Sequence, residues 1–245
     1  MVELERDGGI ARIFLNRREK VNALNSPLLE SLATELERLA KDERLRVAVL
    51  AGRGKVFCAG ADVAELAALN ASTASAFVGR VHRVCAALRA LPVPVVARLH
   101  GVVIGAGLEI AAACDLRIAA KGTRFAMPEV KLGIPSVVEA ALLPRLIGSG
   151  RAAWLVLTGE AIDAERAYDW GLVEELTDEL DQTVGRVVQS LVAADRRALQ
   201  QQKALLQLWE EAPLARSIDA SLARFAEAYA GGVPPALRRH TISRA

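Results

Sequence analysis

The sequence predicts an α/β or α+β core in which β-strands are flanked by helices, followed by a helical C-terminal region. Three observations lead to this fold class. Short apolar runs end repeatedly in glycine-containing turns, helical periodicity follows these turns, and beyond about residue 193 only helical patterns remain. A chain of 245 residues with 52% hydrophobic content can bury a large core. We therefore expect one main domain over residues 1–192 and an appended helical region over residues 193–245.

The first part of the chain alternates between strand and helix patterns. Residues 11–15 form a short predicted strand after the turn at Asp7-Gly8-Gly9. Ser26 is expected to cap the following helix, with Pro27 in its first position. An apolar stripe at helical spacing supports this helix and consists of Leu28, Leu29, Leu32, Leu36, Leu39 and Ala40. The next predicted elements are a buried strand over 46–51 and helices over 61–69 and 72–88.

The same succession is then repeated. The predicted elements are a strand over 93–99, a turn at His100-Gly101, a helix over 106–113, strands over 115–120 and 123–126, and a helix over 136–147. The last helix begins with Ser136-Val-Val-Glu139, which has the pattern of a capping box. We interpret Ser136 and Glu139 as caps, with direct chemistry of Glu139 as the alternative.

Composition argues against several classes of protein. The formal net charge is +2 and both signs are mixed along the chain, which does not indicate a nucleic-acid partner. Cys58, Cys85 and Cys114 lack metal-ligand spacing, so we expect reduced thiols in a reducing compartment. The longest apolar stretch, residues 91–113, is interrupted by prolines, glycines and charged residues, so no membrane span is expected. Acidic residues near the N-terminus do not fit a targeting signal, and we expect a cytoplasmic protein.

Two glutamates in consecutive segments are the strongest candidates for chemistry. Glu109 lies in a stretch of apolar and small residues, where a carboxylate loses its solvation at substantial cost. It follows Gly105 by four residues, so its side chain is expected to point back toward the Gly105-Ala-Gly107 turn. Glu129 follows a proline and precedes another apolar run. Two carboxylates placed in this way can carry the acid and base roles of one reaction.

The segment from Val47 to Val63 has a related design. A buried strand leads into a loop of small residues, and Asp62 opens the next helix. Small residues such as Gly60 and Ala61 would let a ligand oxygen approach the unpaired N–H groups at the helix start. The alternative is a tight connection in which Asp62 only caps the helix. Spacing alone does not decide between the two interpretations.

Two common catalytic patterns are not matched. A dinucleotide fingerprint that begins at Gly105 would need a third glycine where Ile110 stands. No Gly-x-Ser-x-Gly elbow occurs, and the three histidines fit no triad signature. Both a dinucleotide-binding enzyme and a serine hydrolase are therefore disfavoured.

Three segments together resemble the crotonase, or enoyl-CoA hydratase/isomerase, superfamily. They are Asn16-Arg-Arg-Glu-Lys-Val-Asn-Ala-Leu-Asn25, Phe57-Cys-Ala-Gly-Ala-Asp62 and Gly101-Val-Val-Ile-Gly-Ala-Gly-Leu-Glu-Ile-Ala-Ala-Ala-Cys-Asp115. Their order and separation match as well, and the likeness covers essentially the whole chain. The resemblance implies a right-handed spiral of repeated strand-strand-helix turns, with a helical C-terminal part that builds a trimer or a dimer of trimers.

The resemblance also implies a catalytic site. The backbone N–H groups of Ala61 and Ala106 would hold the thioester carbonyl oxygen and stabilise an enolate-like oxyanion. Glu109 would help to activate water for attack at C3, and Glu129 would exchange a proton at C2. Family isomerases often keep only the acid that corresponds to Glu129, so the presence of Glu109 favours hydration.

The expected activity is therefore hydration of a 2-enoyl-CoA to a 3-hydroxyacyl-CoA, with a double-bond isomerase or a carbon–carbon lyase as alternatives. No metal and no separate cofactor are expected, because coenzyme A is part of the substrate. RNA binding, which some relatives show, would need a row of basic side chains, whereas the helix over 28–45 mixes both signs. By the same resemblance, the coenzyme A moiety would lie along Lys20, Val21, Ala23, Ala59, Asp62 and Val63.

One segment departs from the family pattern. Many hydratases carry a glycine-rich loop after the second glutamate, whereas this chain has the bulkier Ser136, Val137, Val138 and Glu139. We expect this change to reshape the pocket around the acyl group. It also leaves open whether Glu139 joins the site.

The C-terminal region carries more apolar surface than a solvated tail would. We interpret it as a contact between subunits of a homotrimer or hexamer, and the alternative is packing on the core of the same chain. The residues concerned are Leu205, Leu208, Trp209, Leu214, Ile218, Leu222, Phe225 and Tyr229.

Overall fold

A six-stranded, mostly parallel sheet forms the centre of the molecule. The computed structural model describes residues 2–230, 232, 234 and 237. The strands have the order β1-β2-β3-β4-β6-β8, and only β1 runs antiparallel to its neighbour. Their bounds are β1 (Val2–Asp7), β2 (Ile10–Leu15), β3 (Val47–Gly52), β4 (Val95–Leu99), β6 (Leu116–Ala120) and β8 (Glu175–Thr177).

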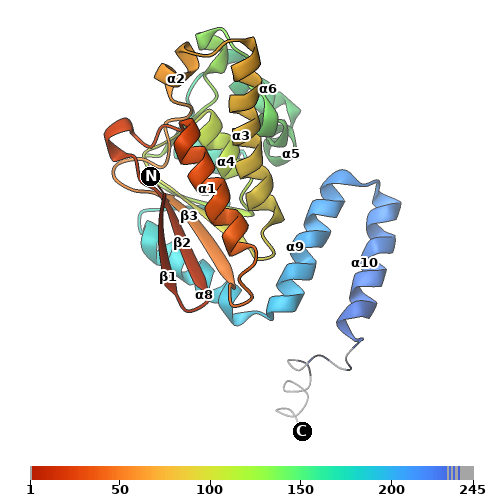
Figure 1. The fold of residues 1–245 in the computed structure, drawn as a ribbon. Coiled ribbons are helices and arrows are strands. Elements are labelled where there is room, and N and C mark those ends of the chain that lie inside the picture. The colour runs from red at the N-terminus through yellow and green to blue at the C-terminus, as the bar shows by residue number, and fades with distance from the viewer. Residues whose placement is uncertain (1, 231, 233, 235–236, 238–245) are drawn as a thin grey trace.

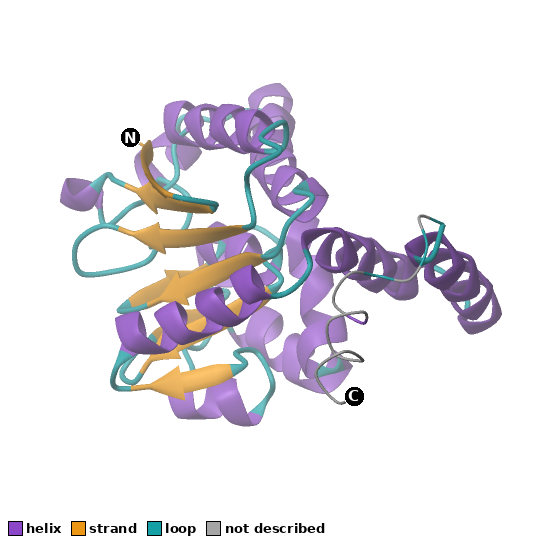
Figure 2. Cartoon of the chain, turned by 90° about the horizontal axis from the view of Figure 1, so that it is seen from below, coloured by secondary structure: helices purple, strands orange, loops and turns teal. Residues whose placement is uncertain are grey.

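Helices cover both faces of this sheet (Figures 1 and 2). On one face lie α1 (Ser26–Leu39), α3 (Ala71–Ala90) and α4 (Ala106–Ala112). On the other face lies α8 (Leu180–Ala193). Alternate strand residues supply the two cores, with Leu50 on the α1 side and Val49 on the α8 side. Because both faces are covered, the central strands consist of apolar residues almost throughout.

Short extended segments build a second layer beside the sheet. β5 (Val102–Ile104) pairs in parallel with β7 (Arg124–Ala126), and an isolated parallel bridge joins Cys58 to Val103. Each turn of the chain therefore contributes one strand to the large sheet, one short extended segment to this layer, and then a helix. The expected spiral of strand-strand-helix turns is the observed architecture.

The remaining elements are short helices and the C-terminal pair. They are η1 (Arg18–Lys20), α2 (Val63–Ala67), η2 (Glu129–Leu132), η3 (Val138–Leu142), α5 (Leu143–Ile147), α6 (Ser149–Thr158), α7 (Ala164–Asp169), α9 (Arg196–Glu211) and α10 (Leu214–Ala228). None of the described helices is long and apolar enough to cross a membrane.

The cap of α1 differs from the prediction. Asn25, not Ser26, is the N-cap, because its backbone is extended and its side-chain oxygen accepts a hydrogen bond from the Leu28 N–H at 3.1 Å. Ser26 is already helical, and both its N–H and its hydroxyl donate to the Glu65 carboxylate instead. The long-range contact with Glu65 could not be read from the local pattern.

The predicted helix over 136–147 was wrong in its first half. The chain forms the 3-10 helix η3 from Val138 and becomes α-helical only from Leu143. The expected capping box does not form, since Ser136 donates to Glu129 and Glu139 contacts His82. Val138 has a φ of 41°, a left-handed conformation that is unfavourable for a β-branched residue.

The C-terminal helices form a hairpin that projects from the body (Figures 1 and 2). α9 lies against the core through the buried Lys203, whereas α10 packs against α9. The apolar side chains of α10 do not pack on the core of their own chain, so that alternative is wrong for this helix. Ile218, Leu222 and Phe225 are 53%, 67% and 68% exposed. The end of the region 193–245 lies outside the described residues.

Candidate active site

A largely apolar cavity of about 650 Å³ lies between α2, α3, the start of α4 and the segment 128–138. The four residues expected to perform the chemistry, Ala61, Ala106, Glu109 and Glu129, all line this one cavity. The rest of the wall consists mainly of apolar side chains from Leu66, Leu69, Phe77, Val78, Val81, Leu132, Ile134, Val137 and Val138.

Two residues that line this cavity have unpaired backbone N–H groups. In the described part of the chain, neither the N–H of Ala61 nor that of Ala106 donates a hydrogen bond to another protein group. Ala106 is the first residue of α4, so its N–H lacks a partner within the helix. Such groups are available to an anionic oxygen that enters the cavity.

The two N–H groups lie in neighbouring segments because the extended layer joins them. The Ile104 N–H donates to the Cys58 carbonyl at 3.1 Å, which holds the turn before α4 beside the loop that contains Ala61. Gly60 makes this approach feasible. Its φ is +92°, and a Cβ at this position would lie 2.9 Å from the Ile104 carbonyl oxygen.

Glu109 is buried in the first turn of α4. The residue is only 5% exposed. Burial, together with the nearby charges of Glu129 and Glu139, raises the pKa of Glu109 to about 8. At neutral pH, this carboxyl group is therefore mainly in its acid form in the free protein.

Glu129 reaches the cavity from η2, and both of its carboxylate oxygens have defined neighbours. Oε1 lies directly over the Cα of Gly105, in the space where any other residue would place its Cβ. Oε2 accepts a hydrogen bond from the Ser136 hydroxyl at 2.8 Å. Since Gly105 immediately precedes Ala106, this carboxylate lies close to one of the two unpaired N–H groups.

Glu139 lies behind the cavity, not in its wall. The residue is 8% exposed, and its Oε1 is 2.8 Å from Nδ1 of His82 on α3. Its Oε2 is buried without a hydrogen-bond partner. Sequence reasoning missed both the Ser136–Glu129 and the His82–Glu139 contacts, because neither has a local signal in the sequence.

Five of the six residues expected to contact coenzyme A lie in the cavity wall or in the loop before it. Ala59 and Val63 line the cavity. Lys20, Val21 and Ala23 lie in the preceding loop, where the Val21 carbonyl accepts a hydrogen bond from the Ala59 N–H at 3.1 Å.

Asp62, the sixth residue of that set, has a structural role. Its carboxylate caps α2 by accepting from the N–H groups of Ala64 and Glu65, and it forms an ion pair with Arg17 at 2.5 Å. Arg17 lowers the pKa of Asp62. The expected cap of this helix by Asp62 is therefore confirmed.

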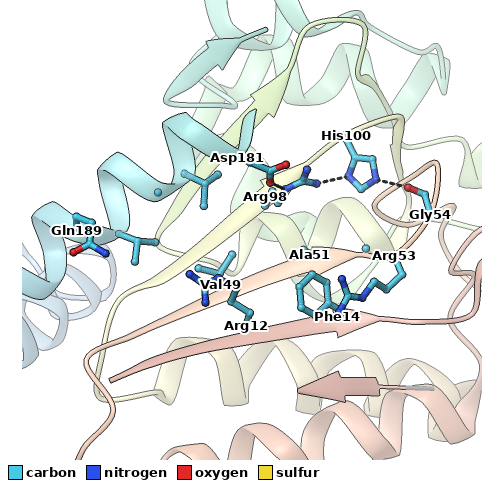
Figure 3. Close-up of a pocket in the computed structure, with 14 residues that line it drawn as sticks. Arg12, Phe14, Val49, Ala51, Arg53, Gly54, Arg98, His100, Asp181 and Gln189 are labelled. Carbon is cyan, nitrogen blue, oxygen red and sulfur yellow. Dashed lines mark hydrogen bonds and ion pairs between the residues drawn. The ribbon is translucent and has the colours of Figure 1, made fainter. Parts of the chain in front are cut away.

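A second cavity of about 490 Å³ lies on the opposite side of the sheet, beside α8 (Figure 3). It contains none of the expected catalytic residues. Arg98 donates to Asp181 and to His100, while Arg53 stacks on Phe14. His100 Nε2 lies 3.0 Å from the Gly54 carbonyl, which requires a proton on Nε2 and leaves Nδ1 as the acceptor from Arg98. Arg53 and Arg98 are thus engaged by protein groups.

Comparison with known proteins agrees with the geometry. The family model of enoyl-CoA hydratase/isomerase matches residues 5–230. The chain belongs to the enoyl-CoA hydratase/isomerase family. Its crotonase-type fold is shared with an enoyl-CoA hydratase from Mycobacterium smegmatis, with a TM-score of 0.91, 32% identity and coverage of 94% of this chain and 91% of that chain.

Curated members of the enoyl-CoA hydratase/isomerase family differ in the reaction that their names state. A crotonyl-CoA hydratase of Syntrophomonas wolfei is 36% identical over 76% of this chain and 74% of its own length. A trans-2-decenoyl-[acyl-carrier-protein] isomerase of Streptococcus mutans is 35% identical over 76% and 73%, respectively. Family membership therefore establishes a crotonase-type enzyme. It does not distinguish hydration from isomerisation.

Proposed function

We propose that this enzyme hydrates a 2-enoyl-CoA to a 3-hydroxyacyl-CoA. The observation that carries the proposal is the convergence of two unpaired N–H groups and two carboxylates in one apolar cavity. The thioester carbonyl oxygen would accept hydrogen bonds from Ala61 and Ala106. These donors would stabilise the negative charge that develops on this oxygen, an effect of typically a few kcal/mol per donor.

The two carboxylates lie beside different parts of α4, which supports separate roles for them. Glu129 lies over Gly105, next to the Ala106 donor, and C2 is the carbon adjacent to the thioester carbonyl. Glu129 is therefore assigned to proton exchange at C2. Glu109 lies further along α4 and is assigned to the water that attacks C3.

The cycle begins with Glu109 ionised and Glu129 protonated. The water oxygen bonds to C3 while the π electrons of the double bond move to the thioester oxygen as an enolate. The water gives up one proton to Glu109, the enolate collapses as C2 receives one proton from Glu129, and the proton on Glu109 returns to Glu129 through solvent before the next turnover. Only the ionised form of Glu109 can accept a proton, and its raised pKa makes that form a minority at neutral pH.

The cavity wall supports an apolar acyl group. Its apolar side chains come from α2, α3 and the segment 128–138, and the polar side chains among the described lining residues are those of the two glutamates, Asn70 and Ser75. The coenzyme A moiety would leave the cavity past Ala59 and Val63 toward the loop with Lys20, Val21 and Ala23. No separate cofactor takes part.

We also propose that the enzyme is a homotrimer or a hexamer. The exposed apolar stripe of α10 supports this assembly, since a stripe of this size rarely faces water in a monomer. The C-terminal hairpin projects from the body (Figure 1), which leaves the exposed face of α10 open to another subunit.

Isomerisation of the double bond is the second candidate, supported by the related isomerase of Streptococcus mutans. An isomerase needs the oxyanion donors and one carboxylate that moves a proton at C2. Glu109→Gln distinguishes the two reactions: hydration is expected to fall much more than any isomerase activity.

The direct test is loss of enoyl absorbance when purified protein is mixed with crotonyl-CoA or longer 2-enoyl-CoA thioesters. We expect hydration by the wild type. Glu129→Gln is expected to lower turnover by roughly 100-fold or more while leaving the fold intact, because the variant lacks the group that moves the proton. A wild type without hydration at every chain length contradicts the hydratase proposal. Near-normal turnover of Glu129→Gln removes Glu129 from the mechanism.

A further inference from the structure

Glu129 has one protein donor to hold its carboxylate in place. Among the described residues, the Ser136 hydroxyl is the only group that donates a hydrogen bond to the Glu129 carboxylate. The other lining residues near Glu129 are Gly105, Pro128, Leu132 and Ile134. None of them has a side chain that can donate a hydrogen bond to a carboxylate. A glutamate side chain has several rotatable bonds, so without this donor its carboxylate would sample several positions.

The backbone brings Ser136 back over Glu129. Gly133 ends η2 in a left-handed conformation with φ 76°, and its N–H and that of Ile134 donate to the carbonyls of Val130 and Glu129, respectively. This tight turn reverses the chain within a few residues. Pro135 then directly precedes Ser136 in the sequence.

The far side of the loop is held as well. Val138 keeps a left-handed φ of 41°, which persists only where surrounding contacts impose it. The next residue, Glu139, is buried and lies 2.8 Å from His82 of α3. A loop fixed at both ends can hold the Ser136 hydroxyl at a defined place.

We propose that Ser136 is a positioning residue of the C2 proton-transfer step, which fixes Glu129 so that Oε1 remains over Gly105 and faces the substrate. The inference rests on the proposed role of Glu129. In this arrangement, the proton moves between C2 and Oε1 of Glu129, while Ser136 keeps its own proton and donates it to Oε2. Ser136 forms no covalent bond with the substrate.

Exchange of the C2 proton of butyryl-CoA in deuterium oxide tests this step in isolation. The C2–H bond breaks, Glu129 takes the proton, the enolate is held by the N–H donors, and a deuteron returns to C2. No water is added, so Glu109 is not needed. The compared proteins are wild type, Ser136→Ala, Ser136→Thr and, as a control, Ser190→Ala, whose side chain is exposed on α8 at the other face of the sheet.

Ser136→Ala is expected to lower the exchange kcat about tenfold to a hundredfold, the effect of one hydrogen bond to a charged group, with little change in KM. Ser136→Thr retains a hydroxyl and is expected to recover most of the rate, and Ser190→Ala to match the wild type. Unchanged exchange in Ser136→Ala overturns the inference. Equal losses in the Ala and Thr variants with a raised KM also overturn it, because they indicate a packing role.

Crystal structures of the wild type and Ser136→Ala provide a readout besides activity. Glu129 is expected to leave its place over Gly105 in the variant, and an unmoved carboxylate contradicts the inference. The two proposals can fail separately. A wild type that exchanges the C2 proton but hydrates no enoyl-CoA refutes the hydratase function, whereas the displaced carboxylate and slowed exchange in Ser136→Ala would still support the role of Ser136.

Discussion

The two glutamates of the cavity, and Glu139 behind its wall, have different neighbours. Glu109 is enclosed by apolar groups and two further carboxylates, which favours its neutral form. Glu129 has a hydroxyl donor, and Glu139 has a histidine neighbour.

The raised pKa of Glu109 predicts the pH dependence of hydration. If Glu109 accepts a proton from water, kcat/KM is expected to rise with pH through about 8, as the ionised form becomes the major one. Glu139→Gln removes a neighbouring negative charge and should shift the rise of kcat/KM to lower pH. Burial still keeps the pKa of Glu109 above its usual value. The pH profiles of both proteins check this. A kcat/KM that instead falls as pH rises through this range would indicate that Glu109 acts as an acid and not as a base.

Gly105 is expected to tolerate no side chain. Its φ of 52° is in a region that other residues rarely adopt, and an added Cβ would overlap Oε1 of Glu129. We expect Gly105→Ala to displace this carboxylate and to lower kcat by roughly 100-fold. Gly79→Ala on α3 is the matched control, because an added Cβ there meets nothing within 4 Å. Steady-state kinetics compare the two, and equal activity would contradict the placement of Glu129.

At the scale of elements, one buried lysine attaches the C-terminal hairpin to the core. Nζ of Lys203 on α9 donates to the carbonyls of Leu88 and Val93 and to Oδ2 of Asp115 at 2.7 Å. The same Asp115 oxygen accepts from the N–H of Val95, the first residue of β4. Lys203 therefore connects α9 to the end of α3 and to the start of a central strand.

Lys203→Met is expected to lower the free energy of unfolding by about 3 kcal/mol, because it leaves a partly buried carboxylate and two carbonyls without their donor. Lys121→Met is the control. Lys121 forms an exposed pair with Asp178, and such solvent-screened pairs contribute little to stability. Urea denaturation at one fixed protein concentration measures both. A similar decrease in the free energy of unfolding of the two variants would show that the Lys203 contacts do not stabilise the protein more than an exposed ion pair does.

At the scale of the whole molecule, the surface of α10 is the feature that its own chain does not explain. Its apolar side chains recur on one face, at Leu214, Ile218, Leu222, Phe225 and Tyr229. The rings of Phe225 and Tyr229 contact each other in a tilted arrangement, with centroids 5.3 Å apart. The body of the subunit buries its core without this helix.

Leu222→Glu is expected to convert the proposed trimer or hexamer to smaller species, because a charge would be desolvated at the contact. Ala223→Glu places the same charge on another exposed face of α10 and is expected to leave the assembly unchanged. Size-exclusion chromatography with light scattering gives the mass of each protein. A monomeric wild type at micromolar concentration would refute the assembly proposal.

Much of the architecture could be predicted from local patterns. Apolar runs and glycine turns located β2, β3, β4, β6 and β7, since these elements depend on periodicity within a few residues. β1, β5 and β8 were not predicted. The helix over 136–147 was misplaced because the competing contacts of Ser136 and Glu139 come from residues outside that segment.

The sequence by itself determined the family, the order of the elements and the identity of the two glutamates, because motif residues and their spacing are properties of the chain. Only the tertiary structure decided that Ala61 and Ala106 line one cavity and that their N–H groups remain unpaired. It also decided that Ser136 holds Glu129 and that Glu139 lies behind the wall. The physical reason is that these contacts join separate segments, whose distances are set by parallel strand pairing and glycine-permitted close packing.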